Sequence, residues 1–258
     1  MTELIFIAPL RHPDTTDSWE RVSELMGDTL ASVCNQEDPD FRVIVVCNEL
    51  PVNIPEHEKV KFLHVDYPPP PTIDLDNGGL DFIQIDKGAK MIAGLLHARN
   101  HAPRHVMFFD ADDLVSNRLC GFLKNCPDSH GWYVNQGYLL ADAERKMYKL
   151  NNFQEYCGTC NILNFSELPE MNLPEQASQT EILQAVNHKY LKFALGGHRV
   201  MHRFQELMGK PMQQLPFAGA VYRTEHGCNV SHTGKRLIDP HQEIPVSADL
   251  QQEFRLPY

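Results

Sequence analysis

The chain lacks any long run of apolar residues. Its 258 residues are 42% hydrophobic, yet no apolar stretch approaches the roughly 20 residues that a helix needs to span a bilayer. The first segment, MTELIFIAPLRHPD, has an acidic residue before a short apolar run and no small-residue cleavage site, which is typical of a first strand rather than a signal peptide. With 22% charged residues the composition is that of an ordinary globular protein, and we expect a cytoplasmic location.

Positive charge is also scarce. The 23 lysines and arginines face 34 acidic residues, which gives a formal net charge of −11. This balance argues against sequence-independent binding to nucleic acid or to anionic lipid, so we expect no nucleic-acid partner. An anionic small ligand is still compatible with it, because local basic residues and a metal ion can overrule the global field.

Cysteine patterns typical of zinc or redox sites are sparse. The seven cysteines are odd in number, and only Cys157 and Cys160 form a C-x-x-C, with no second pair elsewhere. A zinc or redox role for this pair is one interpretation. Reduced thiols in a cytosol are the simpler one.

Strand and helix patterns alternate through the first half of the chain. Apolar or β-branched runs predict strands over 4–10, 41–49, 60–67 and 105–110, and helical periodicity predicts helices over 17–36 and 86–100. Asp17 and Glu20 have the spacing of a capping box for the first helix. The alternation predicts an α/β fold with right-handed crossovers, a mainly parallel sheet and helices on both faces. In such sheets ligands bind outside the carboxyl ends of the strands.

The second half has a different pattern. Four prolines at 68–71 predict an irregular segment over 68–79. The segments of the second half predict a smaller antiparallel region. The predicted strands there are 131–142, 145–150, 158–165 and one beginning at 217, and the predicted helices are 178–191, with a Ser178–Glu181 capping box, and 198–210. We expect one domain over 1–258, with halves at 1–115 and 116–238 and a polar tail at 239–258.

Three carboxylates follow the fourth predicted strand, in the stretch FFDADDLVSN at 108–117. Asp110 and Asp112 are spaced so that both can converge on one cation, which supplies the opposite charge that clustered aspartates need. Mg²⁺ or Mn²⁺ suits oxygen ligands and often completes its shell with phosphate oxygens. The motif therefore predicts metal-bridged diphosphate chemistry. For Asp113 a second interpretation is a cap on a helix that begins near Ser116.

This stretch resembles the DxD motif of glycosyltransferases of the GT-A fold, especially family-2-like enzymes. The family's first strand is resembled by FIAPLR and its second strand by VIVVCNE. The helix before the DxD strand is resembled by KGAKMIAGLLHARNHA, and a late strand ending in a metal-side histidine by LPFAGAVYRTEHGCNVSH. The resemblance covers roughly residues 4–235. It implies a GT-A (nucleotide-diphospho-sugar transferase) fold with a nucleotide-sugar-binding half followed by an acceptor-side half. It also implies metal-dependent transfer of a sugar from a UDP- or GDP-type donor to a glycan, lipid-linked or small-molecule acceptor.

The resemblance also implies roles for single residues. The metal ligands would be Asp110, Asp112 and His232, with His226 the alternative histidine, and Asp113 would be a catalytic residue that lies behind the metal ligands or near the sugar. The residues that hold the nucleotide would be Pro9, Arg11, Asn48, Glu49, Lys87, Lys90, Asp110 and Lys235, the last beside Arg236 in a basic turn. Lys87 and Lys90 flank Gly88 at an expected helix N-terminus, a natural anion site. For most of these the alternative is an ordinary turn or solvated surface residue.

An inverting enzyme also needs a base for the acceptor hydroxyl. By the resemblance Glu181 would be that base, with Glu155 a weaker candidate. The capping box with Ser178 explains Glu181 equally well, and a retaining mechanism then stays open.

Other functions are compatible with parts of the pattern. A nucleotidyltransferase of similar build would need a glycine-rich loop after the first strand, and APLRHPDTTD has no glycine. A phosphatase would place its aspartate after the first strand rather than the fourth, and the glycine and distal glutamate of an EF-hand are missing. A non-catalytic relative that binds a nucleotide or glycan on the same scaffold is a further alternative.

Overall fold

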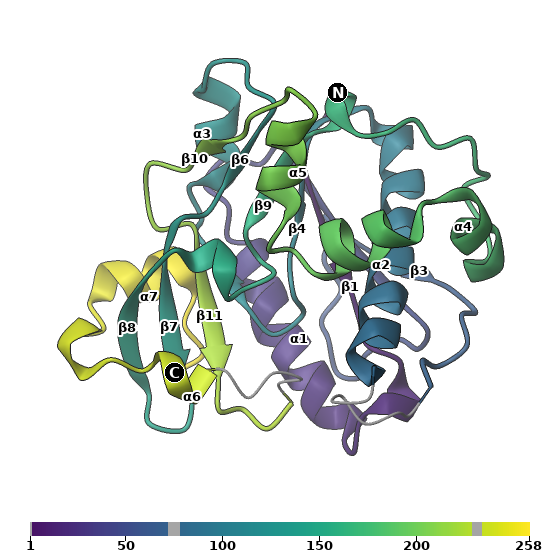
Figure 1. The fold of residues 1–258 in the computed structure, drawn as a ribbon. Coiled ribbons are helices and arrows are strands. Elements are labelled where there is room, and N and C mark those ends of the chain that lie inside the picture. The colour runs from purple at the N-terminus through teal and green to yellow at the C-terminus, as the bar shows by residue number, and fades with distance from the viewer. Residues whose placement is uncertain (1, 72–77, 229–233) are drawn as a thin grey trace.

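The fold is built around a large mixed sheet with a smaller sheet beside it (Figure 1). The computed structural model describes residues 2–71, 78–228 and 234–258. The large sheet contains β1 (Thr2–Pro9), β2 (Phe41–Cys47), β3 (Val60–His64), β4 (Pro103–Phe108), β6 (Gly131–Tyr133), β9 (Asn161–Asn164) and β10 (Gln213–Gln214). The small sheet contains β5 (Leu114–Val115), β7 (Gln136–Ala141), β8 (Lys146–Asn151), β11 (Ala220–Thr224) and β12 (Glu243–Ile244).

The helices are distributed over both faces of the large sheet and along the small one (Figure 1). They are α1 (Trp19–Val33), α2 (Gly79–Ala98), α3 (Leu119–Asn125), α4 (Gln179–Ala185), α5 (Met201–Leu207), α6 (Gly234–Leu237) and α7 (Ala248–Phe254), with a π-helical segment η6 (Tyr190–Gly196). None of the described helices combines the length and apolarity needed to cross a bilayer.

The order of the large sheet is β10-β6-β9-β4-β1-β2-β3. Strands β3, β2, β1 and β4 are parallel neighbours, and β9 runs antiparallel between β4 and β6. Helix α1 connects β1 to β2 and α2 precedes β4 after β3, whereas residues 48–59 join β2 to β3 without a helix. The predicted fold class, a mainly parallel sheet flanked by helices with a smaller antiparallel region, is confirmed.

The two faces of the sheet follow from the alternation of side chains along its central strand. On β1, Leu4 and Phe6 join the core beneath α1, whereas Ile5 and Ile7 join the core beneath α2. All four are fully buried, as expected for a strand covered on both faces. Gly94 of α2 lies against the Ile7 side chain so closely that a Cβ there would clash, which fixes how near the helix approaches the sheet.

Several predicted boundaries are wrong. Helix α1 is capped by Ser18, whose hydroxyl accepts a hydrogen bond from the backbone N–H of Arg21 at 3.1 Å, so the predicted Asp17–Glu20 capping box does not form. Helix α2 begins at Gly79 rather than near residue 86. The predicted strand 131–142 is two strands, β6 in the large sheet and β7 in the small one. In contrast, the Ser178–Glu181 capping box is confirmed at the start of α4.

The tail at 239–258, predicted to be polar, packs onto the small sheet. Strand β12 pairs with β8, and α7 follows it. Phe254 is fully buried in a cluster with Leu140 and Val221, and its ring meets that of Tyr138 edge to face at 5.6 Å. The last residues therefore close an apolar face that the small sheet would otherwise expose.

Replacing Phe254 by alanine should destabilise the protein by about 3 kcal/mol, because it removes a fully buried ring and leaves a cavity. Urea unfolding followed by circular dichroism measures this. Phe193→Ala is the control, since the Phe193 ring is 45% exposed and its loss should change stability by less than about 0.5 kcal/mol. Equal stability of the two variants would contradict the anchoring role of α7.

Candidate functional site

The carboxylate cluster occupies the loop that leaves β4 at the carboxyl edge of the large sheet. The chain continues the sheet pairing through Phe109, whose N–H donates to the carbonyl of Ile7 at 3.1 Å. It then turns sharply, and the N–H of Asp113 donates to the carbonyl of Asp110 at 3.3 Å. The turn places the three aspartates in three different environments.

Asp113 is buried, with 1% of its surface exposed. Its Oδ2 accepts hydrogen bonds from Thr159 Oγ1 at 2.5 Å and from Cys157 Sγ at 2.9 Å, and its Oδ1 accepts one from the backbone N–H of Arg223 at 3.2 Å. Burial, and then the charges of Asp112 and Asp110, raise the pKa of Asp113 well above its usual range, although the bonds from Cys157 and Thr159 favour the charged form.

This environment corrects one interpretation of Asp113. The helix that follows begins at Leu119 with Arg118 as its N-cap, so Asp113 does not cap it. The catalytic role predicted for Asp113 stays a prediction, and the side chain is held by three donors in the interior. Sequence analysis missed Thr159, whose hydroxyl also accepts the N–H of Asp110 at 2.9 Å. In the CGTC stretch the sequence pattern points to the two thiols rather than to Thr159, and all seven cysteines are free.

Asp110 faces α2. Its Oδ1 forms an ion pair with Lys87 Nζ, and its carboxylate lies against Gly158 so closely that a Cβ at residue 158 would clash. Burial acts to lower the pKa of Lys87, but the Asp110 carboxylate outweighs it and holds this pKa above its ordinary value. The Asp110 side chain remains 29% exposed. A cation and a partly exposed carboxylate therefore lie side by side at the sheet edge.

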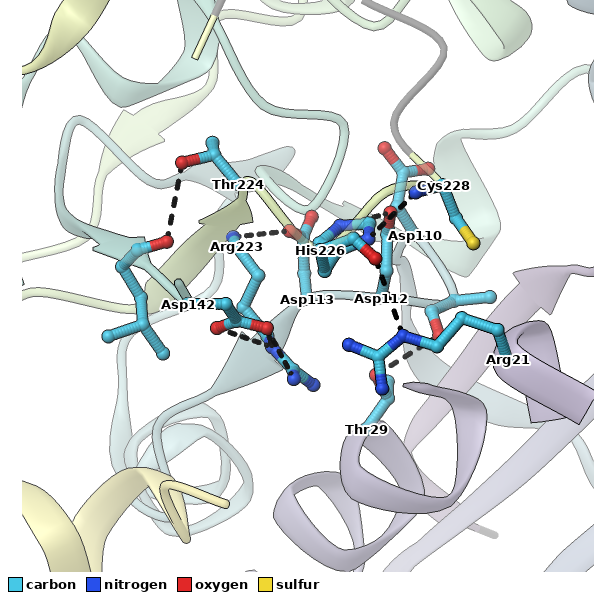
Figure 2. A network of polar contacts seen from close by, with 12 residues as sticks. Arg21, Thr29, Asp110, Asp112, Asp113, Asp142, Arg223, Thr224, His226 and Cys228 are labelled. Atoms are coloured by element: carbon cyan, nitrogen blue, oxygen red, sulfur yellow. Dashed lines mark hydrogen bonds and ion pairs between the residues drawn. The ribbon is translucent and has the colours of Figure 1, made fainter. Parts of the chain in front are cut away.

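Asp112 faces the other way, toward α1 and the segment after β11 (Figure 2). Its Oδ2 lies 3.1 Å from Nε2 of His226. The His226 ring is buried, whereas the Asp112 side chain is 27% exposed. Burial acts to raise the pKa of Asp112, but the contact with His226 and the charges of His226, Arg11 and Lys87 lower it below its usual range. The backbone N–H of Cys228 donates to Nδ1 of His226 at 3.3 Å, so the ring proton faces Asp112.

Helix α1 fixes both the loop and the histidine, as Figure 2 shows. Thr29 Oγ1 donates to the carbonyl of Ala111 at 3.1 Å, and Arg21 Nε donates to the carbonyl of His226 at 3.3 Å. Beside them, the buried Arg223 guanidinium pairs with Asp142 at 2.7 Å and Asp28 at 3.1 Å. These contacts join α1 and the small sheet to the loop that carries the aspartates.

The residues predicted to hold a nucleotide lie at the ends of β1 and β2. Pro9 is the last residue of β1, and Arg11 follows it, close enough for its charge to act on Asp112. Asn48 follows β2, where its Nδ2 donates to the carbonyls of Val65 and Tyr67 at 3.1 and 2.7 Å. Its Oδ1 is buried and, within the described residues, lacks a hydrogen-bond partner. Glu49 is exposed beside it.

The predicted anion site at a helix N-terminus is wrong. Helix α2 begins at Gly79, which puts Lys87 and Lys90 in its middle turns. The Lys90 side chain is fully buried, where its Nζ pairs with Asp86 Oδ2 at 3.0 Å and donates to the carbonyl of Leu10 at 2.9 Å. Lys90 therefore holds the loop after β1 from the protein interior, whereas the Lys87 ammonium lies at the sheet edge beside Asp110, and nucleotide binding by either residue stays a prediction.

Glu181 lies outside this cluster, on α4. The backbone N–H and the hydroxyl of Ser178 both donate to its Oε2 at 2.7 Å, and these two bonds lower its pKa. The capping interpretation is thus confirmed, and the catalytic role stays a prediction. Glu155, the weaker candidate, lies 3.4 Å from Arg203.

The side chains of two predicted residues, His232 and Lys235, lie outside what the structure describes. His232, the preferred metal histidine, lies outside the described residues. Lys235 belongs to α6, and the Arg236 beside it is exposed. His226, the alternative histidine, is the one that contacts Asp112.

The aspartates fit a divalent metal ion that keeps open positions. No three His, Cys, Asp or Glu side chains in the described part of the chain already converge as a metal site. Mg²⁺ and Mn²⁺ bind through one or two carboxylates and complete their shells with water and phosphate, so the partly exposed Asp110 and Asp112 have the ligand chemistry of such a site, although they face different sides of the loop. His226 Nε2 would join them only by releasing the ring proton that now faces Asp112.

A surface cavity of about 1030 Å³ lies elsewhere. Residues of the opposite edge of the large sheet line it, among them Pro103 at the start of β4, Asn164 at the end of β9 and Gln213 of β10. None of the predicted site residues lines this cavity. The candidate site is therefore an open edge of the sheet rather than this hollow.

No protein-family profile matches the chain, and no curated protein matches it in sequence. Solved structures with a similar layout include the 2-C-methyl-D-erythritol 4-phosphate cytidylyltransferase of Francisella tularensis, 12% identical over 91% of this chain and 96% of that one, with a TM-score of 0.37. A candidate nucleotide-diphospho-sugar transferase of Desulfovibrio desulfuricans is 9% identical over 86% and 82%, at 0.39. An active-site mutant of LgtC is 9% identical over 97% and 99%, at 0.36. These likenesses concern the fold alone.

Replacing Thr159 by valine should destabilise the protein by about 2 kcal/mol, because the buried Asp113 carboxyl loses a hydrogen-bond donor while the volume is kept. Thr159→Ser keeps the hydroxyl and should lose less. Chemical denaturation of both variants measures the difference. If valine and serine are equally tolerated, the bond between Thr159 and Asp113 does not hold the loop.

Proposed function

We propose that the chain transfers a sugar from a nucleoside-diphosphate donor to an acceptor hydroxyl, and that Mn²⁺ or Mg²⁺ holds the donor diphosphate at the sheet edge. The observation that carries this proposal is the placement of two partly exposed carboxylates, Asp110 and Asp112, beside the cations Lys87 and Arg11. Carboxylates alone would repel a diphosphate, whereas carboxylates with a metal ion and two cations attract one.

The roles of the residues follow from the directions in which they face. Asp112 would be the first metal ligand and Asp110 the second, and His226 would support or join them, because its Nε2 lies 3.1 Å from Asp112 Oδ2. When bound, the metal ion supplies Lewis-acid stabilisation of the charge that develops on the leaving diphosphate. Lys87 balances the same charge from the α2 side, because it already lies against Asp110.

The nucleoside would lie over the ends of β1 and β2. The buried Asn48 Oδ1 offers a hydrogen-bond acceptor there, and such an acceptor is costly to leave unpaired. Arg11 and the exposed Glu49 border the same surface. A UDP- or GDP-type donor presents N–H or hydroxyl groups that complement this amide oxygen. The acceptor would be a glycan, a lipid-linked compound or a small molecule.

Binding of a nucleotide should depend on both the metal ion and Asp112. With Mn²⁺ present, one of UDP, GDP, CDP or TDP, alone or as a sugar conjugate, should raise the melting temperature by about 5–10 °C at 100 times its Kd. Asp112→Asn should lower the affinity at least about tenfold and remove much of the shift, because it removes the charge that a metal ion requires. Differential scanning fluorimetry measures both.

Asp128→Asn is the matched control, because the Asp128 side chain is 96% exposed and pairs with Arg104 away from the sheet edge. It should leave the shift unchanged. A nucleotide that binds equally well without Mn²⁺, or equally well to Asp112→Asn, would contradict the metal-bridged diphosphate.

The products separate sugar transfer from nucleotidyl transfer. Incubation of the best-bound nucleotide sugar with Mn²⁺ should release a nucleoside diphosphate, seen by ³¹P NMR, because the proposed cleavage is between the sugar and the diphosphate. Slow transfer to water is sufficient for this test. Release of pyrophosphate from a nucleoside triphosphate and a sugar phosphate, with no nucleoside diphosphate from the sugar conjugate, would instead identify a nucleotidyltransferase.

A further inference from the structure

Two of the seven buried side-chain polar atoms that lack a hydrogen-bond partner within the described ranges, 2–71, 78–228 and 234–258, lie on residues that contact each other. They are Oδ1 of Asn161, a residue with 3% exposure, and Nε2 of His198. The two residues touch, because Nδ2 of Asn161 donates to the carbonyl of His198 at 3.3 Å. Buried polar atoms are nearly always paired, so this pair calls for a partner that the described residues do not provide.

The position of this pair connects it with the candidate site. Asn161 opens β9 directly after the loop 157–160, and Gly158 and Thr159 of that loop contact Asp110. The charge of Lys87, the ion-pair partner of Asp110, reaches His198. The pair therefore lies on the α2 side of Asp110, whereas His226 and Asp112 lie on the α1 side (Figure 2).

The backbone at His198 has a positive φ, which is uncommon for residues other than glycine. Its φ is +44°, in the left-handed region that favours glycine, although the two preceding residues are glycines. The segment before it, η6, is pressed onto α2, where Gly196 packs against the carbonyl of Gln84 and Gly88 against that of Leu191. Six other described residues besides glycine also have a positive φ, so the backbone angle supports a role for His198 only together with its buried Nε2, which lacks a partner among the described residues.

The imidazole is uncharged under ordinary conditions. Burial, and then the charges of Lys87 and Arg199, lower the pKa of His198 to about 3. A neutral imidazole and an amide oxygen complement groups that both donate and accept hydrogen bonds, as hydroxyls do, and they offer no charge to an anion.

We propose that His198 and Asn161 form a subsite that binds the hydroxyl groups of an uncharged sugar ring next to Asp110. The inference rests on the proposed function, since it assigns the part of the nucleotide-sugar donor beyond the diphosphate. His198 and Asn161 are then the residues that distinguish a nucleotide sugar from the bare nucleotide.

The test compares each nucleotide sugar with its own nucleoside diphosphate. Isothermal titration calorimetry with Mn²⁺ would use UDP, UDP-glucose, UDP-galactose, UDP-N-acetylglucosamine, GDP and GDP-mannose. We expect the wild-type protein to bind at least one conjugate about tenfold more tightly than its free diphosphate, which corresponds to about 1.4 kcal/mol.

His198→Gly is the informative variant, because glycine accepts a positive φ and removes the strained side chain without disturbing the backbone. It should fold with an unchanged or higher melting temperature and keep the affinity for the free diphosphate within about twofold. The affinity for the conjugate should fall until it is about equal to that for the free diphosphate, so that the ratio of the two affinities is about one. Asn161→Ala should reduce the ratio in the same way, and His198→Gln, which keeps a hydrogen-bonding end, should restore part of it. Phe193→Ala, at an exposed position of η6, is the control and should change neither value.

The outcomes separate the two proposals. Three results would overturn the subsite while the nucleotide site stands. The wild-type protein could bind every conjugate no more tightly than its free diphosphate, or His198→Gly and Asn161→Ala could leave the ratio of the two affinities unchanged. The variants could also lose affinity for the free diphosphate as much as for the conjugate. Failure of every nucleoside diphosphate to bind the wild-type protein overturns the proposed function and this inference with it.

Discussion

The hydrogen bonds that the buried Asp113 carboxyl accepts are the constraint on which the site depends. They come from the loop before β9 through Cys157 and Thr159, and from β11 through the backbone of Arg223. Three segments distant in sequence therefore meet at one carboxyl group, and both sheets are tied to the end of β4 there. Without these donors, three adjacent carboxylates in a partly buried loop would repel one another and the turn would open.

The fixed turn directs its other two aspartates to opposite sides of the loop. Asp110 is directed to α2, where Lys87 partners it, and Asp112 is directed to the α1 side, where His226 does. Each keeps part of its carboxylate accessible while a positively charged or proton-bearing group limits the repulsion. In the proposed function this arrangement would attract a metal ion and a diphosphate together, which neither the net charge of −11 nor the carboxylates alone would favour.

Much of the scaffold could be predicted from local pattern, because buried strands and amphipathic helices leave a period in the sequence. The runs that became β1 and β2, the Ser178–Glu181 box and the position of the aspartates after β4 were found in this way. The partners of Asp113 could not be found, since Thr159 and Arg223 are brought to it only by the sheet topology. The early start of α2 also escaped prediction, because Gly78 and Gly79 give no capping signal, and this misplaced the expected anion site. The role proposed for His198 carries no sequence signal, since it rests on the backbone angle and on a nitrogen that has no hydrogen-bond partner among the described residues.

The central claim is that the edge formed by Asp110 and Asp112 holds a metal ion and a diphosphate together. The most direct test is a crystal structure of the protein with Mn²⁺ and its best-bound nucleoside diphosphate, with anomalous difference density recorded at the manganese edge. The account predicts a manganese peak in contact with the Asp112 carboxylate and with diphosphate oxygens. A nucleotide bound at this edge without manganese, or manganese bound away from Asp112, would contradict it.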